Sequence, residues 1–158
     1  MEKEKKLREQ LVKHLKGGEA FNPIDDFLED MPFEKLGIRP DGLPYSFYEV
    51  FYHIVFAQKD ILEFSIAGSY TTSTWPDDYW PKEQQPKNEE DWERLKKEYF
   101  DDRLELEEFL LDLNNGLLEP VKNAEHQSLF REVMLVVEHT AYHSGQLLII
   151  QRLLGLRK

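Results

Sequence analysis

The chain has 158 residues, of which 41% are hydrophobic and 13% aromatic, a composition that predicts a single folded domain spanning residues 1–158 and argues against general disorder. Its 20 basic and 31 acidic residues give a formal charge of −11, which argues against a nucleic-acid partner because phosphate binding requires clustered Lys and Arg. The absence of cysteine excludes disulfides, thiolate ligands and a cysteine nucleophile, and it fits a cytoplasmic protein.

The N-terminal residues 1–6 are mostly charged and lead into no apolar segment, so we expect no signal peptide. The longest aliphatic run, residues 147–150, is far too short to cross a bilayer. We therefore expect a cytoplasmic protein that has no membrane partner.

The first predicted helix covers residues 3–16, where Leu7, Leu11 and Leu15 recur at four-residue spacing, and Gly17 and Gly18 end it. His14 lies beside this stripe, and we interpret it as a surface or packing residue rather than a ligand.

A long connection follows in residues 17–44, which contain four prolines. Asn22 as the N-cap and Pro23 as the first helical residue predict a short helix that ends near Asp30. A connection of this length is uncommon in a small domain unless it crosses other elements or lines a site.

The second long helix is predicted over residues 46–66. Ser46 and Glu49 have the spacing of a capping box, in which the side chain of each accepts a hydrogen bond from the backbone of the other. Apolar residues then recur at helical spacing up to Gly68. His53 lies at the edge of this apolar stripe, so its side chain can reach the interior of a helical bundle.

Residues 68–88 interrupt the helical pattern with three prolines but contain Tyr70, Trp75, Tyr79 and Trp80. These aromatic side chains are expected to cover the end of the bundle, to form a wall of a pocket, or to do both.

The third long helix is predicted over residues 88–114. Asn88 suits the N-cap, and the three acidic residues after it favour the positive end of the helix dipole. Asn114, Asn115 and Gly116 should end the helix. The predicted buried stripe consists of Trp92, Leu95, Tyr99, Leu106, Phe109, Leu110 and Leu113.

The last long helix is predicted over residues 128–154, with Ser128 as N-cap and Gly155 in a left-handed C-terminal cap. It is apolar on nearly all sides, which is typical of a central helix or of one in an interface. Four long helices without a convincing strand predict an all-α four-helix bundle with a crossover connection. The surplus apolar residues of the last helix predict a homodimer: Leu135, Leu148, Ile149 and Leu153.

Three histidines form the candidate functional site. His139 and His143 are four residues apart, so their side chains lie on one face of the last helix, and His53 holds the matching position on the second long helix. Such a set can bind a divalent metal, and the nitrogen ligands do not distinguish Zn(II), Ni(II) and Fe(II). Three protein ligands leave open positions, as in catalytic zinc sites. Thr140 stands where a metalloprotease helix has its general-base Glu, so the protease interpretation is excluded.

Two other polar residues of the last helix lie near the histidines in the sequence. Glu132 lies seven residues before His139 and is most simply an acid in the first turn of its helix. Gln146 lies near His143 and is a weak candidate for a hydrogen bond to a ligand histidine or to substrate. No catalytic residue is assigned. Two alternatives remain open, namely a non-catalytic dimeric module with a structural metal, and three ordinary core histidines without metal.

Several segments together resemble the DinB-like superfamily. The resemblance rests on residues 17–20 (Gly-Gly-Glu-Ala), 39–44 (Arg-Pro-Asp-Gly-Leu-Pro), 52–62, 79–81 (Tyr-Trp-Pro) and 139–147, which begin with His-Thr-Ala-Tyr-His. The last motif, combined with the histidine of the upstream helix, is fairly specific.

This resemblance implies an up-down-down-up four-helix bundle, a dimer, and a divalent metal bound by residues matching His53, His139 and His143. It also implies a metal-dependent enzyme with a small-molecule substrate. A transferase that uses a low-molecular-weight thiol is favoured over a hydrolase, on the family resemblance alone. The DNA-damage origin of the family's name does not imply DNA binding.

Overall fold

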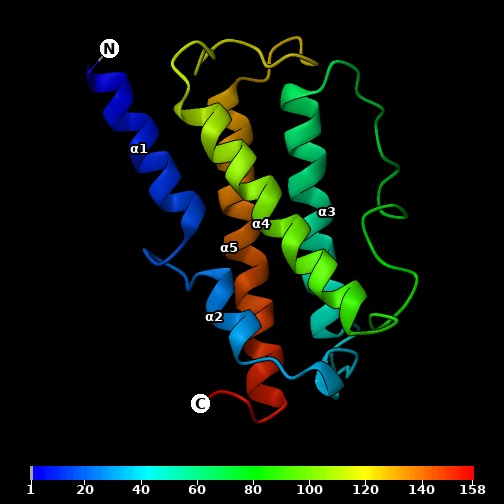
Figure 1. Ribbon diagram of the computed structural model, residues 1–158. Coiled ribbons are helices and arrows are strands. Elements are labelled where there is room, and N and C mark those ends of the chain that lie inside the picture. The colour runs from blue at the N-terminus through cyan, green and yellow to red at the C-terminus, as the bar shows by residue number, and fades with distance from the viewer. Residues whose placement is uncertain (1) are drawn as a thin grey trace.

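The computed structural model describes residues 2–158 as a bundle of four long helices with a short helix and a 3-10 turn at one end (Figure 1). The predicted all-α fold is confirmed, since the described residues contain no strand and only one isolated bridge, between Pro120 and Ser128. The elements are α1 (Glu2–Lys16), α2 (Ile24–Glu29), η1 (Phe33–Lys35), α3 (Phe47–Ile66), α4 (Glu89–Leu111) and α5 (Leu129–Leu153).

The starts of α3, α4 and α5 that were predicted from capping patterns are confirmed. Ser46 and Glu49 form the full capping box of α3, and the side chains of Asn88 and Ser128 cap α4 and α5. Gly155 adopts a φ of +72° after α5, and the amide of Leu156 donates to the carbonyl of Gln151, as expected for a left-handed C-terminal cap.

Two boundaries differ from the prediction. The short helix starts at Ile24 with Pro23 as its N-cap residue, because the Asn22 side chain donates to the Asp26 carboxylate instead of capping the backbone. Helix α4 ends at Leu111 rather than at residue 114, so Leu113, predicted to be buried, is 48% exposed.

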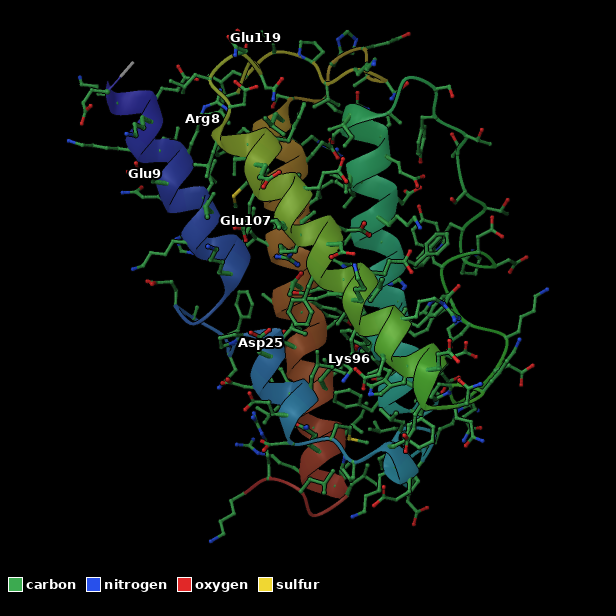
Figure 2. The ribbon with its side chains drawn as sticks, viewed as in Figure 1. Arg8, Glu9, Asp25, Lys96, Glu107 and Glu119 are labelled. Atoms are coloured by element: carbon green, nitrogen blue, oxygen red, sulfur yellow. The ribbon has the colours of Figure 1, made fainter. Side chains whose placement is uncertain are left out.

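A buried arginine explains the early end of α4. The Arg8 side chain points from α1 toward the C-terminal end of α4 and is 1% exposed (Figure 2). Its guanidinium donates to the carbonyls of Leu110, Asp112 and Asn115 at 2.5, 3.3 and 2.6 Å. These hydrogen bonds satisfy carbonyls that have no partner inside the helix, and they hold the chain in the turn that follows it.

The interior consists of two apolar clusters with a polar layer between them. One cluster is rich in aromatic residues, including Phe47, Phe51 and Trp92, and the other is formed mainly by Leu and Val. In the polar layer, buried Arg103 on α4 donates to the side chains of Gln58 on α3 and Thr140 on α5, at 2.6 and 3.2 Å. This network links three helices at the level where α5 carries its histidines.

The connection of residues 67–88 determines one side of the molecule. It runs back along α3, so α4 starts near the end of the bundle where α3 starts (Figure 1). It contains no helix or strand, and the cis peptide bond of the chain lies within it, between Trp75 and Pro76. Across residues 2–158, none of the helices combines the length and the apolar character that a membrane span needs.

Candidate metal centre

The three predicted histidines come together between α3 and α5. One ring nitrogen of each residue lies within 4.8 Å of those of the others. His53 and His143 are buried, while His139 is partly exposed. His14, by contrast, is on the surface, as predicted. The three histidines singled out from the sequence therefore lie in one cluster that could hold a metal ion.

Hydrogen bonds fix the tautomers of two of these rings. His53 Nδ1 lies 3.1 Å from the Tyr79 carbonyl oxygen, and His143 Nδ1 lies 2.5 Å from Gln146 Oε1. A carbonyl oxygen can only accept, so each Nδ1 carries a proton and donates it. The Nε2 atoms of His53 and His143 therefore carry the lone pairs, and that of His53 faces His139 Nε2 at 2.9 Å, within hydrogen-bond distance. Gln146, a weak candidate from sequence, thus contacts a histidine of the cluster and also donates to the Tyr45 hydroxyl at 3.1 Å.

Burial keeps the imidazoles neutral. It lowers the pKa of His53 to about 4 and that of His139 to about 3, with the neighbouring histidine His143 adding to both shifts. Burial also lowers the pKa of His143. Neutral imidazole is the form that binds a metal, so at neutral pH no proton has to be removed before binding.

The spacing of the nitrogens also suits a metal. His139 Nε2 and His53 Nε2 are 2.9 Å apart. Two nitrogens bound at about 2.1 Å to one ion are separated by about 3.0–3.4 Å for bond angles from square to tetrahedral. The separation of this pair is close to the short end of this range, and one nitrogen of each of the three residues lies within 4.8 Å of the others, so the set could hold a divalent ion.

An aromatic wall covers His53. The Trp80 ring stacks on the His53 imidazole with centroids 4.2 Å apart and planes at 3°, and the Tyr45 ring stacks with Trp80 at a centroid distance of 6.5 Å. Trp75 and Tyr79 also contact His53 with their rings. Trp75, Tyr79 and Trp80 therefore form a wall of a pocket, which is one of the two roles expected for the aromatic residues of this connection.

Asp60 attaches this wall to α3. Its carboxylate accepts hydrogen bonds from Tyr70, Ser73 and Tyr79, at 2.9, 3.3 and 2.6 Å. Tyr79 thus bonds twice to α3, through its hydroxyl to Asp60 and through its carbonyl to His53. Asp60 was not among the residues predicted for the site. It follows His53 by seven residues, so both side chains lie on nearly the same face of α3.

The histidines open into a cavity of about 550 Å³. Helix α3 and the connection provide one part of its lining and α5 the other. The lining comprises Tyr45, His53, Ala57, Asp60, Ile61, Trp75, Tyr79, Trp80, Leu135, His139, Tyr142, His143 and Gln146. A concave, mainly apolar cavity with a few convergent polar groups is the usual form of a small-molecule site.

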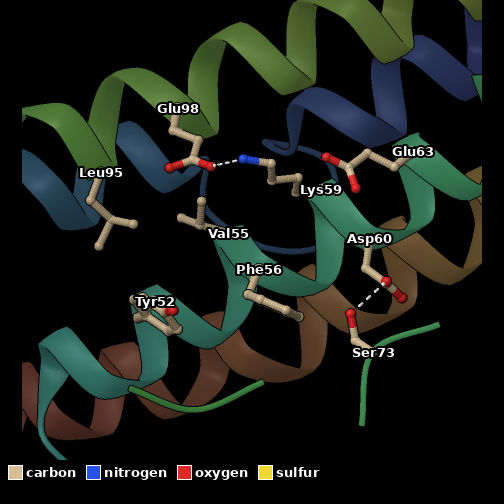
Figure 3. A pocket seen from close by; sticks show the side chains of 9 residues that line it. All are labelled: Tyr52, Val55, Phe56, Lys59, Asp60, Glu63, Ser73, Leu95 and Glu98. Carbon is tan, nitrogen blue, oxygen red and sulfur yellow. Dashed lines mark hydrogen bonds and ion pairs between the residues drawn. The ribbon is translucent and has the colours of Figure 1, made fainter. Parts of the chain in front are cut away.

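A second, smaller cavity of about 250 Å³ lies between α3 and α4 and shares Asp60 with the first (Figure 3). Its polar lining includes the ion pair of Lys59 with Glu98, at 2.5 Å, and the Ser73–Asp60 hydrogen bond (Figure 3). Asp102 lies beside Glu98 and Lys59, and burial, with Glu98 adding to the effect, raises its pKa to about 6. No histidine lines this cavity, so the candidate metal ligands belong to the larger one.

Glu132 does not join the histidine cluster. It is buried in the first turn of α5 and forms an ion pair with Arg131 at 2.5 Å. The interpretation of Glu132 as a helix-start acid is therefore the one that fits.

Comparison with known families agrees with this architecture. The sequence model of the DinB superfamily matches residues 20–147, which include all three histidines. The chain is therefore a member of the DinB superfamily. Searches of curated proteins and of solved structures find no match.

Proposed function

We propose that this chain is a metal-dependent enzyme in which His53, His139 and His143 bind one divalent metal ion, Zn(II), Ni(II) or Fe(II). The observation that carries the proposal is the convergence of three neutral imidazole nitrogens, within 4.8 Å of one another, on an open cavity of about 550 Å³. Three protein ligands leave room for water or substrate, whereas structural zinc sites are closed by four.

Within this proposal, the favoured reaction is transfer of a low-molecular-weight thiol to a small electrophile. In that reaction the thiol loses its proton, a bond forms between sulfur and the electrophilic carbon, and the bond to the leaving group breaks with its electron pair. A bound metal would supply the thiolate, because coordination deprotonates a thiol outright. Since the chain has no cysteine, the thiol must come from a cosubstrate.

The residues around the histidines favour thiol transfer over hydrolysis. Hydrolysis generally uses a carboxylate or histidine as a general base near the attacking water. The carboxylate that lines the cavity, Asp60, already accepts hydrogen bonds from three hydroxyl groups. The protein's own role would be to orient His53 and His143 through Tyr79 and Gln146, and to keep water from the His53 ring by the stacked Trp80.

Metal analysis of protein purified without a histidine tag tests the site. Wild-type protein should retain about one ion per chain, as expected for a three-ligand site, and His143→Ala and His139→Gln should lose it. His126→Ala is the matched control because that side chain is 91% exposed and outside the cluster. Equal, substoichiometric metal in wild type and His143→Ala would contradict the proposal.

The alternative function is a non-catalytic dimeric module with a structural metal. It is favoured by the exposed apolar residues of α5, since Ile149 and Leu153 are 46% and 56% exposed. We propose a homodimer through this face, which also includes the partly buried residues Leu135 and Leu148. Light scattering at micromolar concentration tests the dimer, and a monomeric mass would contradict it. A large loss of melting temperature with chelator, without turnover of thiol–electrophile mixtures, would favour the structural role.

A further inference from the structure

The cavity beside the histidines has walls made of aromatic rings. Trp75, Tyr79 and Trp80 come from the connection, Tyr45 precedes α3, and Tyr142 projects from α5. Trp75 and Tyr142 remain 64% and 68% exposed, so their rings are accessible to a ligand that enters the cavity. Flat apolar groups lose little conformational freedom on binding and pack well against such rings.

The charges of the lining select against anionic ligands. None of the described residues that line the cavity is Lys or Arg, so an anionic group would enter a chain of net charge −11 without a basic partner. The Asp60 carboxylate accepts hydrogen bonds from the neutral hydroxyls of Tyr70, Ser73 and Tyr79 and keeps its charge, so it adds to the repulsion of an anion. Placing an unpaired charge in a partly desolvated site is costly.

We infer that this cavity binds a flat aromatic molecule that carries no anionic group and whose reactive end reaches the three histidines. This inference rests on the proposed function for the role of that molecule, which is the electrophile that accepts the thiol. The carboxylates that common cellular thiols carry would have no cationic partner inside the cavity. The cavity of about 550 Å³ falls within the range of about 300–1,000 Å³ that is usual for small-molecule sites.

Calorimetric titration with three matched naphthalenes tests the inference: 2-naphthylmethanol, 2-naphthoate and (2-naphthylmethyl)trimethylammonium. The full-length chain is titrated as purified and again after chelator treatment, with its fold checked by circular dichroism. The alcohol and the ammonium should each bind at least about tenfold more tightly than the carboxylate after chelator treatment, because the carboxylate finds no basic partner in the lining while the ammonium can pack on the aromatic rings. The carboxylate binding as tightly as the alcohol in chelator-treated protein would overturn the inference.

Variants localise the binding. Trp75→Ala and Tyr142→Ala should each weaken binding of the alcohol about tenfold, in line with the loss of a large aromatic contact at a binding site. Phe100→Ala is the matched control, because Phe100 is a 40% exposed aromatic residue on α4 that does not line the cavity. Unchanged affinity in both Trp75→Ala and Tyr142→Ala would place the ligand elsewhere and refute the inference.

The outcome is separable from that of the proposed function. Binding of the alcohol is measured without metal and without turnover. Selective binding in a protein that retains no metal would refute the metal enzyme and support the ligand class. A protein that retains one metal ion as purified but binds the carboxylate as tightly as the alcohol after chelator treatment would support the metal site and refute the ligand class.

Discussion

Tyr79 bonds to α3 through its hydroxyl and through its backbone carbonyl. Removing the hydroxyl oxygen alone therefore tests whether this residue positions His53. Its hydroxyl donates to Asp60 Oδ2 at 2.6 Å, and its backbone carbonyl accepts from His53 Nδ1 at 3.1 Å. Tyr79→Phe removes only the hydroxyl oxygen. The carbonyl then has to hold His53 without the anchor that fixes the residue to the helix.

The size of the effect follows from the type of bond. A hydrogen bond to a charged group contributes about 1.5–3 kcal/mol when buried. Since Tyr79 and Asp60 are only partly buried, we take the lower end, about 1.5 kcal/mol, which corresponds to about a tenfold change in a dissociation constant. Losses of this size, about 10–100-fold, are typical when a group that orients a metal-binding histidine is removed.

The assay is competition for Zn(II) between the protein and a chromogenic chelator at pH 7.5. Tyr79→Phe should bind zinc about tenfold more weakly than wild type. Tyr70→Phe is the control, because its hydroxyl binds the same Asp60 carboxylate at 2.9 Å, while the hydrogen bond to His53 comes from Tyr79. Zinc affinity should stay within about threefold of wild type in Tyr70→Phe, because Tyr79, whose carbonyl holds His53, keeps its own hydrogen bond to Asp60. Equal effects of the two substitutions, or none from Tyr79→Phe, would refute the reasoning.

Three further predictions concern stability. Arg8→Ala should lower the free energy of unfolding in urea by about 3 kcal/mol, because it leaves three carbonyls at the end of α4 without their donor; the exposed Lys5→Ala should change it little, and a loss below about 0.5 kcal/mol for Arg8→Ala would contradict the role of Arg8. Ser46→Ala removes the capping box of α3 and should cost about 1 kcal/mol, or about 2–4 °C in melting temperature, and an unchanged melting temperature would contradict this. Burial raises the pKa of Asp102 to about 6, so its ionisation destabilises the fold as pH rises from the unfolded value near 3.8 through 6. Asp102→Asn should therefore stabilise the protein at pH 8 by about 1 kcal/mol after allowance for solvent screening, and not at pH 3.5. The control is Asp101→Asn, because Asp101 is exposed. Equal stabilisation by Asp102→Asn at both pH values would refute the raised pKa of Asp102.

Much of the fold could be predicted because its signals are local. The capping pattern of Ser46 and Glu49, the N-caps Asn88 and Ser128, and Gly155 each act within one turn of chain. The histidine cluster was also accessible, since helical spacing alone puts His139 and His143 on one face. Those residues needed only a packed neighbouring helix to become a site.

The missed features depend on contacts between distant segments. The end of α4 could not be read from residues 112–116, because it depends on Arg8, more than 100 residues earlier. The role of Asp60 requires that a connection without regular structure folds back on α3, and its hydroxyl donors have no fixed spacing in the sequence. Charged residues on helices are usually exposed, so neither Arg8 nor Asp60 stood out.

The cavity is assembled from two kinds of structure that can change independently. Packed helices hold the three histidines, and their arrangement tolerates little alteration without loss of the interior packing. The aromatic wall belongs mostly to residues 70–80, which are joined to the bundle mainly by side chains gathered on one carboxylate. Substitutions in that segment can reshape what the cavity admits while leaving the histidines in place. A bundle built in this way can acquire new substrates by evolution of one loop.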